Sequence, residues 1–247
     1  MATPTFPRPP WSGLGKRLES TIRKALFDYS MLEGVEKLGV ALSGGKDSLA
    51  LLFLLKAIVG HGFPNIELYA LHVSGEFSCG AGVNINYLNL VCNELSIPLL
   101  IRESKQKLET LECYSCSRER RRLLFEACKS VGATTLAFGH HRDDNAQTVL
   151  MNMLHKGEFA GNLPKLHMHD YGVTIIRPLI YISEEDLRTF AQQHGFMRVM
   201  CRCPVGQTSM RRQVADLITE LENLFPNARE NIARAGLLYG SDKAKSK

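Results

Sequence analysis

A glycine-rich segment near the start of the chain carries residue types that bind phosphate. It reads Ser43-Gly44-Gly45-Lys46-Asp47-Ser48, between an apolar run over residues 38–42 and a longer apolar stretch over residues 47–59. A strand, a glycine turn and a helix in this order aim backbone N–H groups and a helix N-terminus at an anion. The glycines let the main chain approach a phosphate closely, Lys46 adds a cation, and the two serines add hydroxyl donors. The segment therefore predicts a nucleotide-binding loop.

This loop differs from a Walker A motif, which has a glycine five places before Gly45 and a serine or threonine after the lysine. Val40 and Asp47 stand at those two positions. The hexapeptide resembles instead the PP-loop of the ATP-pyrophosphatase superfamily. That resemblance implies that ATP is cleaved between its α- and β-phosphates, with Lys46 and Asp47 as catalytic residues and the whole loop holding the pyrophosphate.

A second polar cluster, Gly139-His140-His141-Arg142-Asp143-Asp144, directly follows an apolar run that we expect to be a strand, residues 134–138. Ligands of parallel sheets bind at the carboxyl ends of strands. We therefore predict nucleotide contacts from Gly139 and His140, and from His72 near the end of another expected strand. Asp143 or Asp144 could hold Mg²⁺, which neutralises charge on the departing pyrophosphate. The alternative for Asp143 is that it only caps the next helix.

Four of the seven cysteines have the spacing of metal ligands. Cys113 and Cys116 form a C-x-x-C pair just before an expected helix, and Cys201 and Cys203 lie far downstream. A zinc site would use all four thiolates, whereas an iron–sulfur cluster could use three and leave one iron open. With an odd number of cysteines and no secretion signal, we expect a reducing, cytoplasmic location rather than a disulfide framework.

Arginines gather directly after the C-x-x-C pair. Such a cluster beside a cysteine site suits the phosphate backbone of a nucleic acid, and a solvated helix face is the alternative. The net charge of +5 is compatible with an RNA partner. We therefore predict an RNA-binding surface made by Arg118, Arg120, Arg121 and Arg122, extended by Arg211 and Arg212.

The elements that must position these residues alternate along the chain. Apolar runs alternate with helical patterns, which is typical of an α/β fold whose parallel sheet is covered by helices on both faces. No run has the length of a membrane span. We expect a disordered N-terminus (1–12), a PP-loop domain (13–182) that begins with a helical addition, and a helical C-terminal region (183–247). The expected strands span residues 38–42, 66–73, 97–102, 134–138 and 173–182, and the expected helices span residues 11–30, 47–59, 84–95, 116–132, 143–155, 183–195 and 214–236.

Together, these motifs resemble the TtcA family of tRNA 2-thiocytidine synthetases (tRNA cytidine 2-sulfurtransferases). The matching pieces occur in the same order over residues 13–235. They are the PP-loop, the C-x-x-C with its arginines, the cluster from Gly139 to Asp144, the segment Ile176-Arg177-Pro178-Leu179 and the segment 201–213. The resemblance implies a homodimeric, Mg²⁺-dependent enzyme that uses ATP to adenylate an anticodon-loop cytidine (tRNA position 32). Sulfur from a donor such as a cysteine desulfurase then replaces the 2-oxo group.

The resemblance also implies a [4Fe-4S] cluster held by Cys113, Cys116 and a third cysteine in the C-terminal region. The family has two cysteines separated by two residues at the third position, whereas this chain has Cys201-Arg202-Cys203-Pro204. Alignment without a gap favours Cys201 as the third ligand, with Cys203 as its rival. Two other functions stay open: thiolation of a tRNA uridine by a related PP-loop enzyme, and a zinc-stabilised RNA-binding protein with a degenerate nucleotide site.

Overall fold

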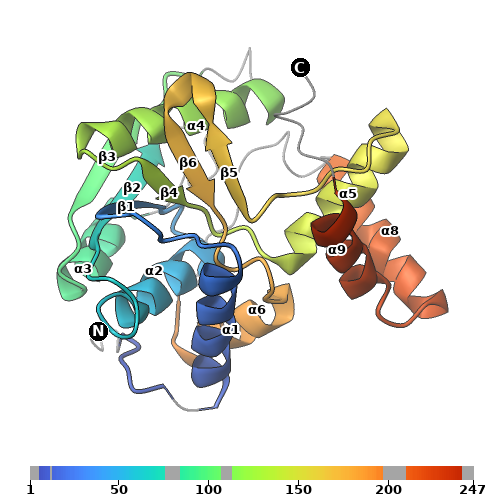
Figure 1. Ribbon diagram of the computed structural model, residues 1–247, viewed down its shortest axis with the longest axis horizontal. Coiled ribbons are helices and arrows are strands. Elements are labelled where there is room, and N and C mark those ends of the chain that lie inside the picture. The colour runs from blue at the N-terminus through green and yellow to red at the C-terminus, as the bar shows by residue number, and fades with distance from the viewer. Residues whose placement is uncertain (1–5, 12, 76–83, 107–112, 197–209, 241–247) are drawn as a thin grey trace.

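A six-stranded sheet with the strand order β3-β2-β1-β4-β6-β5 forms the centre of the molecule (Figure 1). The computed structural model describes residues 6–11, 13–75, 84–106, 113–196 and 210–240. Five strands pair in parallel, and β5 pairs antiparallel with β6 at one edge. The strands are β1 (Lys37–Ala41), β2 (Glu67–Ser74), β3 (Leu99–Glu103), β4 (Thr135–Ala137), β5 (Lys165–Met168) and β6 (Val173–Ile176).

Helices cover both faces of the sheet, as the sequence predicts. On one face, α4 (Cys113–Ser130) packs across β2 and β3. On the other face, α2 (Lys46–Ile58) lies between the sheet and the pair formed by α1 (Leu14–Asp28) and α6 (Glu184–Gln193) (Figure 1). The predicted α/β fold with a mostly parallel sheet is therefore confirmed. The remaining helices are α3 (Ile85–Glu94), α5 (Arg142–Lys156), α8 (Met210–Leu224) and α9 (Ala228–Tyr239), with the short 3-10 turn η2 (His169–Tyr171).

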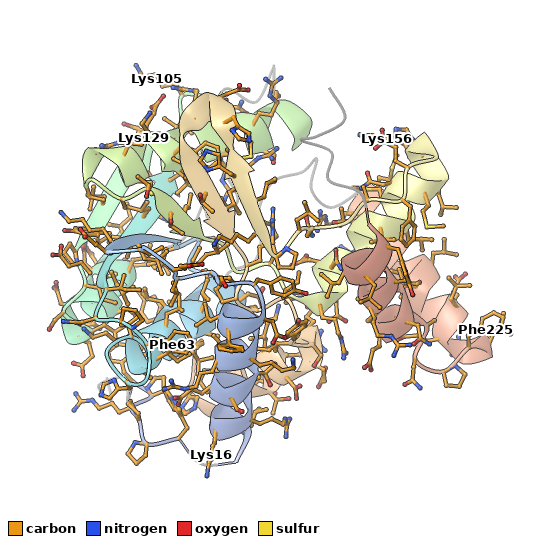
Figure 2. All side chains as sticks on the ribbon, in the orientation of Figure 1. Lys16, Phe63, Lys105, Lys129, Lys156 and Phe225 are labelled. Atoms are coloured by element: carbon orange, nitrogen blue, oxygen red, sulfur yellow. The ribbon has the colours of Figure 1, made fainter. Side chains whose placement is uncertain are left out.

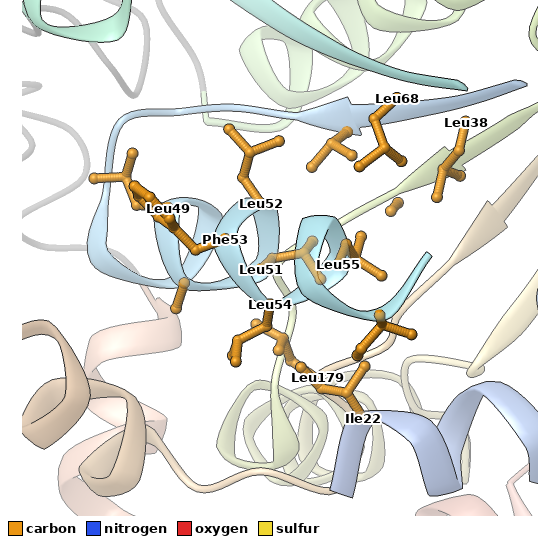
Figure 3. Packing of buried hydrophobic residues seen from close by; sticks show 14 of the residues in the cluster. Ile22, Leu38, Leu49, Leu51, Leu52, Phe53, Leu54, Leu55, Leu68 and Leu179 are labelled. Carbon is orange, nitrogen blue, oxygen red and sulfur yellow. The ribbon is translucent and has the colours of Figure 1, made fainter. Parts of the chain in front are cut away.

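Helix α2 is apolar around nearly its whole circumference because the sheet covers one side and helices α1 and α6 cover the opposite side. Leu52 points toward the strands, while Leu54 points the opposite way, toward Ile22 of α1 and Leu179 (Figure 3). All three leucines are fully buried, and each such burial stabilises the fold by about 1.5–3 kcal/mol. This packing fixes the first turn of α2, and hence the PP-loop, against the end of β1.

Two parts of the sheet differ from the sequence prediction. The strand expected over residues 173–182 ends at Ile176, because Arg177 and Pro178 leave the sheet and the chain turns. Strand β5 was not predicted. It lies at the edge, alternates exposed and partly buried residues, and pairs only with β6.

The C-terminal helices α8 and α9 pack on α5 and lie away from the sheet (Figure 1). The single helix expected over residues 214–236 is wrong, because the chain breaks at Pro226 and at Asn227, whose φ is +70°. Helix α9 approaches α5 closely, since a Cβ on Gly236 would meet Val149 Cγ2 at 2.4 Å. Phe225, at the far tip of α8, is exposed (Figure 2).

Residues 6–11 fall in the segment expected to be disordered. The structure places Phe6 against Phe53 with ring centroids 6.0 Å apart, and Trp11 against Phe190 at 5.8 Å. In the described ranges, none of the helices combines the length and apolarity that crossing a bilayer requires.

Gly39 in the middle of β1 gives a direct test of this packing. A Cβ at this position would lie 2.8 Å from Leu71 Cδ1 and 3.2 Å from Cys128 Sγ. We expect Gly39→Val to lower the free energy of unfolding by about 1–3 kcal/mol, because overpacking forces neighbours off their rotamers. Urea unfolding followed by circular dichroism measures this change. Gly39→Ala, which adds the Cβ alone, is the matched control and should cost less. Equal stability of all three proteins would contradict the close packing.

Candidate active site

The site lies where β1 and β4 end side by side. From β1 the chain enters the PP-loop and α2, and from β4 it enters the segment that leads into α5. The strand order runs one way from β1 to β2 and the other way from β1 to β4, so the two connections diverge and leave a crevice between them. The N-termini of α2 and α5 both begin at this crevice, where their positive dipole ends favour an anion.

The PP-loop is held by its own hydroxyl groups. Gly44 has a φ of +80°, a conformation that favours glycine. The backbone N–H of Gly45 donates to Ser43 Oγ at 3.3 Å, and Ser48 Oγ donates to the Gly45 carbonyl oxygen at 2.9 Å. A Cβ on Gly139 would lie 3.2 Å from the Ser48 backbone nitrogen, so this glycine lets the segment after β4 approach the PP-loop closely.

Lys46 is held between two carboxylates. Its Nζ lies 3.1 Å from Asp47 Oδ1 and 3.2 Å from Glu184 Oε1 at the start of α6. Burial opposes the charge on Lys46, but the two carboxylates outweigh it and raise the Lys46 pKa. Burial raises the pKa of Asp47 as well, against the opposing effect of His141 and Lys46. Burial also disfavours the charged form of Glu184, yet Lys46 holds the Glu184 pKa below its usual value.

A cavity of about 220 Å³ opens beside the loop, and we call it the PP-loop cavity. It brings together six of the predicted site residues and one arginine of the run on α4. His72 is not among the lining residues: it is 2% exposed, and its Nδ1 lies 2.7 Å from the carbonyl oxygen of Leu42. His72 therefore contacts the strand end that leads into the loop. The predicted residues that line the cavity are Ser43, Asp47, Ser48, Gly139, His140, Asp144 and Arg120.

The two neighbouring aspartates of α5 have different surroundings. Asp143 Oδ2 accepts the Glu184 backbone N–H at 2.8 Å, and its Oδ1 lies 3.4 Å from Arg229 Nε of α9. Asp144 faces the PP-loop cavity and completes a capping box with His141, the N-cap of α5. Burial disfavours the charged form of Asp144, but His141 and Arg211 hold its pKa below the usual value. Asp144 is therefore the carboxylate of this pair that faces the nucleotide space.

His140 sits at the wall of the PP-loop cavity, stacked on Phe138 with ring centroids 5.5 Å apart. Arg177 Nε donates to His140 Nδ1 at 3.4 Å, and Arg177 Nη1 donates to the carbonyl oxygen of Leu163. Burial, together with the Arg177 charge, lowers the His140 pKa far below its usual value. His140 is therefore neutral, with Nδ1 as the acceptor and the proton on Nε2.

A second cavity, of about 270 Å³, adjoins the first, and we call it the arginine cavity. Four of its lining residues also line the PP-loop cavity. Among the described residues that line it, four are arginines and none is acidic. The shared residues are Arg120, Leu124, Phe138 and His140, and the arginines are Arg120, Arg121, Arg177 and Arg211.

The arginine run on α4 is divided by the helical period. Arg120 and Arg121 line the arginine cavity together with Ser117, one turn earlier. Arg118 and Arg122 are exposed, and Arg122 pairs with Glu126. Arg211 Nη1 pairs with Asp144 Oδ1 at 3.0 Å, whereas Arg212 is exposed. Of the six predicted RNA-binding arginines, Arg120, Arg121 and Arg211 therefore line a cavity, although Arg121 is also exposed, whereas Arg118, Arg122 and Arg212 are exposed and line neither cavity.

The candidate metal ligands are only partly described. Cys113 is the first residue of α4, and the Cys116 side chain is buried one turn later. Cys201 and Cys203 lie outside the described residues. Within the described part of the chain, no three His, Cys, Asp or Glu side chains group as a metal site requires. Burial raises the thiol pKa of the two core cysteines, to about 12 for Cys92 and about 11 for Cys128, so these thiols stay protonated.

Sequence analysis did not select three residues that the structure places at the site. Arg177 stands in an otherwise apolar run, Ile175-Ile176-Arg177-Pro178-Leu179, and a charge in such a run is a usable signal. It is 8% exposed, and burial lowers its pKa to about 10. Glu184 and Arg229 reach the site from α6 and α9, and nothing in their local sequence indicates this.

Comparison with known families matches residues 15–199 to the PP-loop domain. The tRNA-cytidine(32) 2-sulfurtransferase of Nitrosospira multiformis is 33% identical over 231 residues, covering 89% of this chain and 76% of that protein. The Cronobacter sakazakii protein of the same name is also 33% identical, over 90% of this chain and 74% of its own length. The chain belongs to the TtcA family. As a member of this family it is an ATP-dependent enzyme.

Solved structures place the TtcA-family chain among PP-loop folds. The U34-tRNA thiolase NcsA from Methanococcus maripaludis, solved with its [4Fe-4S] cluster, matches with a TM-score of 0.76 at 27% identity, over 94% of this chain and 82% of NcsA. The NMN synthetase of Francisella tularensis matches with a TM-score of 0.51 at 14% identity over 94% of this chain and 99% of its own, which shows a shared fold alone. The resemblance predicted from the motifs is confirmed.

Proposed function

We propose that this chain uses ATP to replace the 2-oxo group of the cytidine at position 32 of tRNA by sulfur. The observation that supports this most strongly is the contact between the two cavities. The PP-loop cavity, suited to phosphates, opens through shared residues toward a cavity lined by arginines at the start of α4, the helix that begins with the C-x-x-C pair. The relatives from N. multiformis and C. sakazakii are named for the same substrate.

The reaction consists of two displacements. First, the cytidine O2 attacks the α-phosphorus of ATP, the bond from that phosphorus to the bridging oxygen breaks, and pyrophosphate leaves with the electron pair. Second, a hydrosulfide ion attacks C2 of the adenylated base. The C2–O bond breaks, AMP leaves with the oxygen and the electron pair, and the S–H proton passes to water. The products are 2-thiocytidine, AMP and pyrophosphate.

In the first displacement, the residues of the site have three different roles: binding pyrophosphate, holding Mg²⁺ and positioning helices. Ser43, Gly44, Gly45, Lys46 and Ser48 bind the pyrophosphate part of ATP through hydroxyl groups, backbone N–H groups and the Lys46 ammonium. Asp47 and Asp144 face the same space and would hold Mg²⁺, which shields the charge on the leaving pyrophosphate. Asp143, bonded to the Glu184 backbone and close to Arg229, instead positions α6 and α9 at the rim of the site.

The second displacement depends on the cysteines. In this proposal Cys113, Cys116 and either Cys201 or Cys203 hold a [4Fe-4S] cluster, since thiolates are its usual ligands and the C-x-x-C pair provides two of them within one turn of α4. When bound, the cluster would supply sulfur to the activated base. Sulfur comes from a donor such as a cysteine desulfurase, and the enzyme acts on tRNA as a cytoplasmic homodimer.

A tRNA uridine is the second candidate substrate. The solved structure of NcsA, which has the same PP-loop fold and a cluster, belongs to a thiolase named for U34. Both pyrimidines offer an O2 atom to the α-phosphate, so the ATP chemistry does not distinguish them. Discrimination must come from contacts to the exocyclic group of the base.

Mass spectrometry of nucleosides tests the proposal. Protein purified without oxygen is assayed for iron, sulfide and zinc, and then incubated with ATP, Mg²⁺, a sulfide source and tRNA transcripts that carry either cytidine or uridine at position 32. We expect about four irons per chain and 2-thiocytidine only from the cytidine transcript. A 2-thiouridine product would favour the second candidate. Stoichiometric zinc without sulfide, and no thiolated nucleoside, would overturn the proposal.

A further inference from the structure

Arg120 differs from the other arginines of the site in its surroundings. Its side chain lines both the PP-loop cavity and the arginine cavity. Its Nε is buried and has no hydrogen-bond partner within the described ranges. A buried N–H without a partner costs about 1–3 kcal/mol, and more on a charged group. Such a group therefore indicates a ligand that the described residues do not supply.

The other cavity arginines already have partners. Arg211 pairs with Asp144, and Arg177 donates to His140 and to the Leu163 carbonyl. Arg121 Nε donates to the carbonyl oxygen of Ser117 at 3.3 Å. These contacts hold the cavity wall in place. Of the arginines that line the two cavities, Arg120 is therefore the one best placed to exchange protein contacts for substrate contacts.

We infer that Arg120 is a catalytic residue that contacts the α-phosphate of ATP during adenylyl transfer, instead of the tRNA backbone contact that the sequence predicts. This inference rests on the proposed function and assigns one step of it to a side chain. Arg120 forms no covalent bond in this step. The bond between the α-phosphorus and the cytidine O2 forms while the bond between the α-phosphorus and the pyrophosphate oxygen breaks.

The position of Arg120 follows from the direction of this displacement. The PP-loop and the α2 N-terminus bind the leaving pyrophosphate at one end of the PP-loop cavity. The attacking and leaving oxygens must lie roughly in line across the phosphorus, so the base must enter from the side away from the loop. The arginine cavity adjoins the PP-loop cavity at their shared lining residues and offers such an entry, and Arg120 is the cationic residue among those shared residues.

A guanidinium at this position suits the transition state. Negative charge spreads over the non-bridging oxygens of the α-phosphorus, and the planar fork of an arginine can donate to two of them at once. The residues that the two cavities share also include the stacked rings of Phe138 and His140. These rings offer a surface on which a pyrimidine turned out of its stack could lie.

The test separates adenylation from tRNA binding in the cluster-loaded protein. Single-turnover pyrophosphate release is measured with saturating tRNA that carries cytidine at position 32, and the Kd for the same tRNA is measured by filter binding. We expect Arg120→Ala to lower the adenylation rate about 10²- to 10³-fold, with the tRNA Kd changed less than about threefold. Arg120→Lys should recover only a small part of the rate, because an ammonium lacks the planar fork.

Lys129→Ala is the matched control, since Lys129 is an exposed cation at the other end of α4 (Figure 2). It should keep the wild-type rate. If Arg120→Ala keeps the adenylation rate and weakens tRNA binding instead, the inference is overturned and Arg120 is a backbone contact. Absence of tRNA-dependent pyrophosphate release in the wild-type protein would overturn the proposed function itself, so the two failures are distinguishable. Iron content and thermal unfolding of each variant show that the fold is intact.

Discussion

Replacing Lys46 with alanine is expected to lower the rate of tRNA-dependent AMP formation about 10²- to 10³-fold. The substitution removes the cation that faces the leaving pyrophosphate. It also leaves Asp47 and Glu184, which both lie within 3.2 Å of Lys46 Nζ, without their shared counter-charge. Glu184 keeps an ion pair with Arg188, but the net negative charge near the loop rises and repels ATP, so the ATP affinity should fall together with the rate.

Release of labelled AMP from α-labelled ATP measures this loss, and fluorescent-nucleotide titration measures the affinity. Lys56→Ala is the matched control, because Lys56 is an exposed lysine in the last turn of the same helix. A further substitution, Glu184→Gln in the Lys46→Ala background, should recover part of the ATP affinity by removing one carboxylate. Unchanged thiolation in Lys46→Ala would show that the PP-loop assignment is wrong.

Replacing Cys116 with alanine should abolish thiolation while leaving adenylation intact. Cys116 lies within one turn of the start of α4 and, in the proposed function, is a cluster ligand. Loss of one of three thiolates should release the cluster, so no sulfur reaches the activated base. The PP-loop cavity is lined by other residues, so pyrophosphate and the adenylated base still form, while AMP stays bonded to the base.

Three measurements on one preparation check this expectation: iron and sulfide content, tRNA-dependent pyrophosphate release, and 2-thiocytidine in the tRNA. Cys92→Ala is the control, because Cys92 is a buried core thiol whose pKa burial raises to about 12, which disfavours the thiolate that a metal needs. If Cys116→Ala retained iron and thiolated tRNA, the C-x-x-C pair would not hold the cluster. If pyrophosphate release disappeared as well, the two displacements would not be separable.

A helix or strand could be predicted from the sequence where its own residues show a long or regular apolar pattern. Helix α2 was predicted within one residue at each end, because a long apolar run after a glycine turn allows few other structures. Strand β5 was missed because four residues at a sheet edge, half of them exposed, carry almost no periodic signal. The break at Pro226 was overlooked because the apolar spacing continues on both sides of it, although proline is a strong stop signal.

At the site, the residue types were predictable and their partners were not. The sequence places Asp143 and Asp144 next to each other but cannot say which one faces the nucleotide, since that depends on how α5 is rotated against α6 and α9. The same limit applies to the arginine run on α4. The helical period separates Arg120 from Arg118 and Arg122, which lie four residues apart on one face. It does not say which face packs inward, and in the structure Arg120 lines the cavities while the other two arginines are exposed.

The ion pair between Lys46 and Glu184 has a consequence for turnover. Before ATP binds, the lysine already has a partner, so nucleotide binding is an exchange of partners and its net free energy is smaller than the lysine–phosphate attraction alone. In the proposed function, once the base has been adenylated, the same carboxylate can pair with the lysine again as pyrophosphate departs. Glu184 thus competes with the product pyrophosphate for the Lys46 ammonium. An enzyme that must release three products in each cycle gains speed from such a competitor at the cost of some ATP affinity.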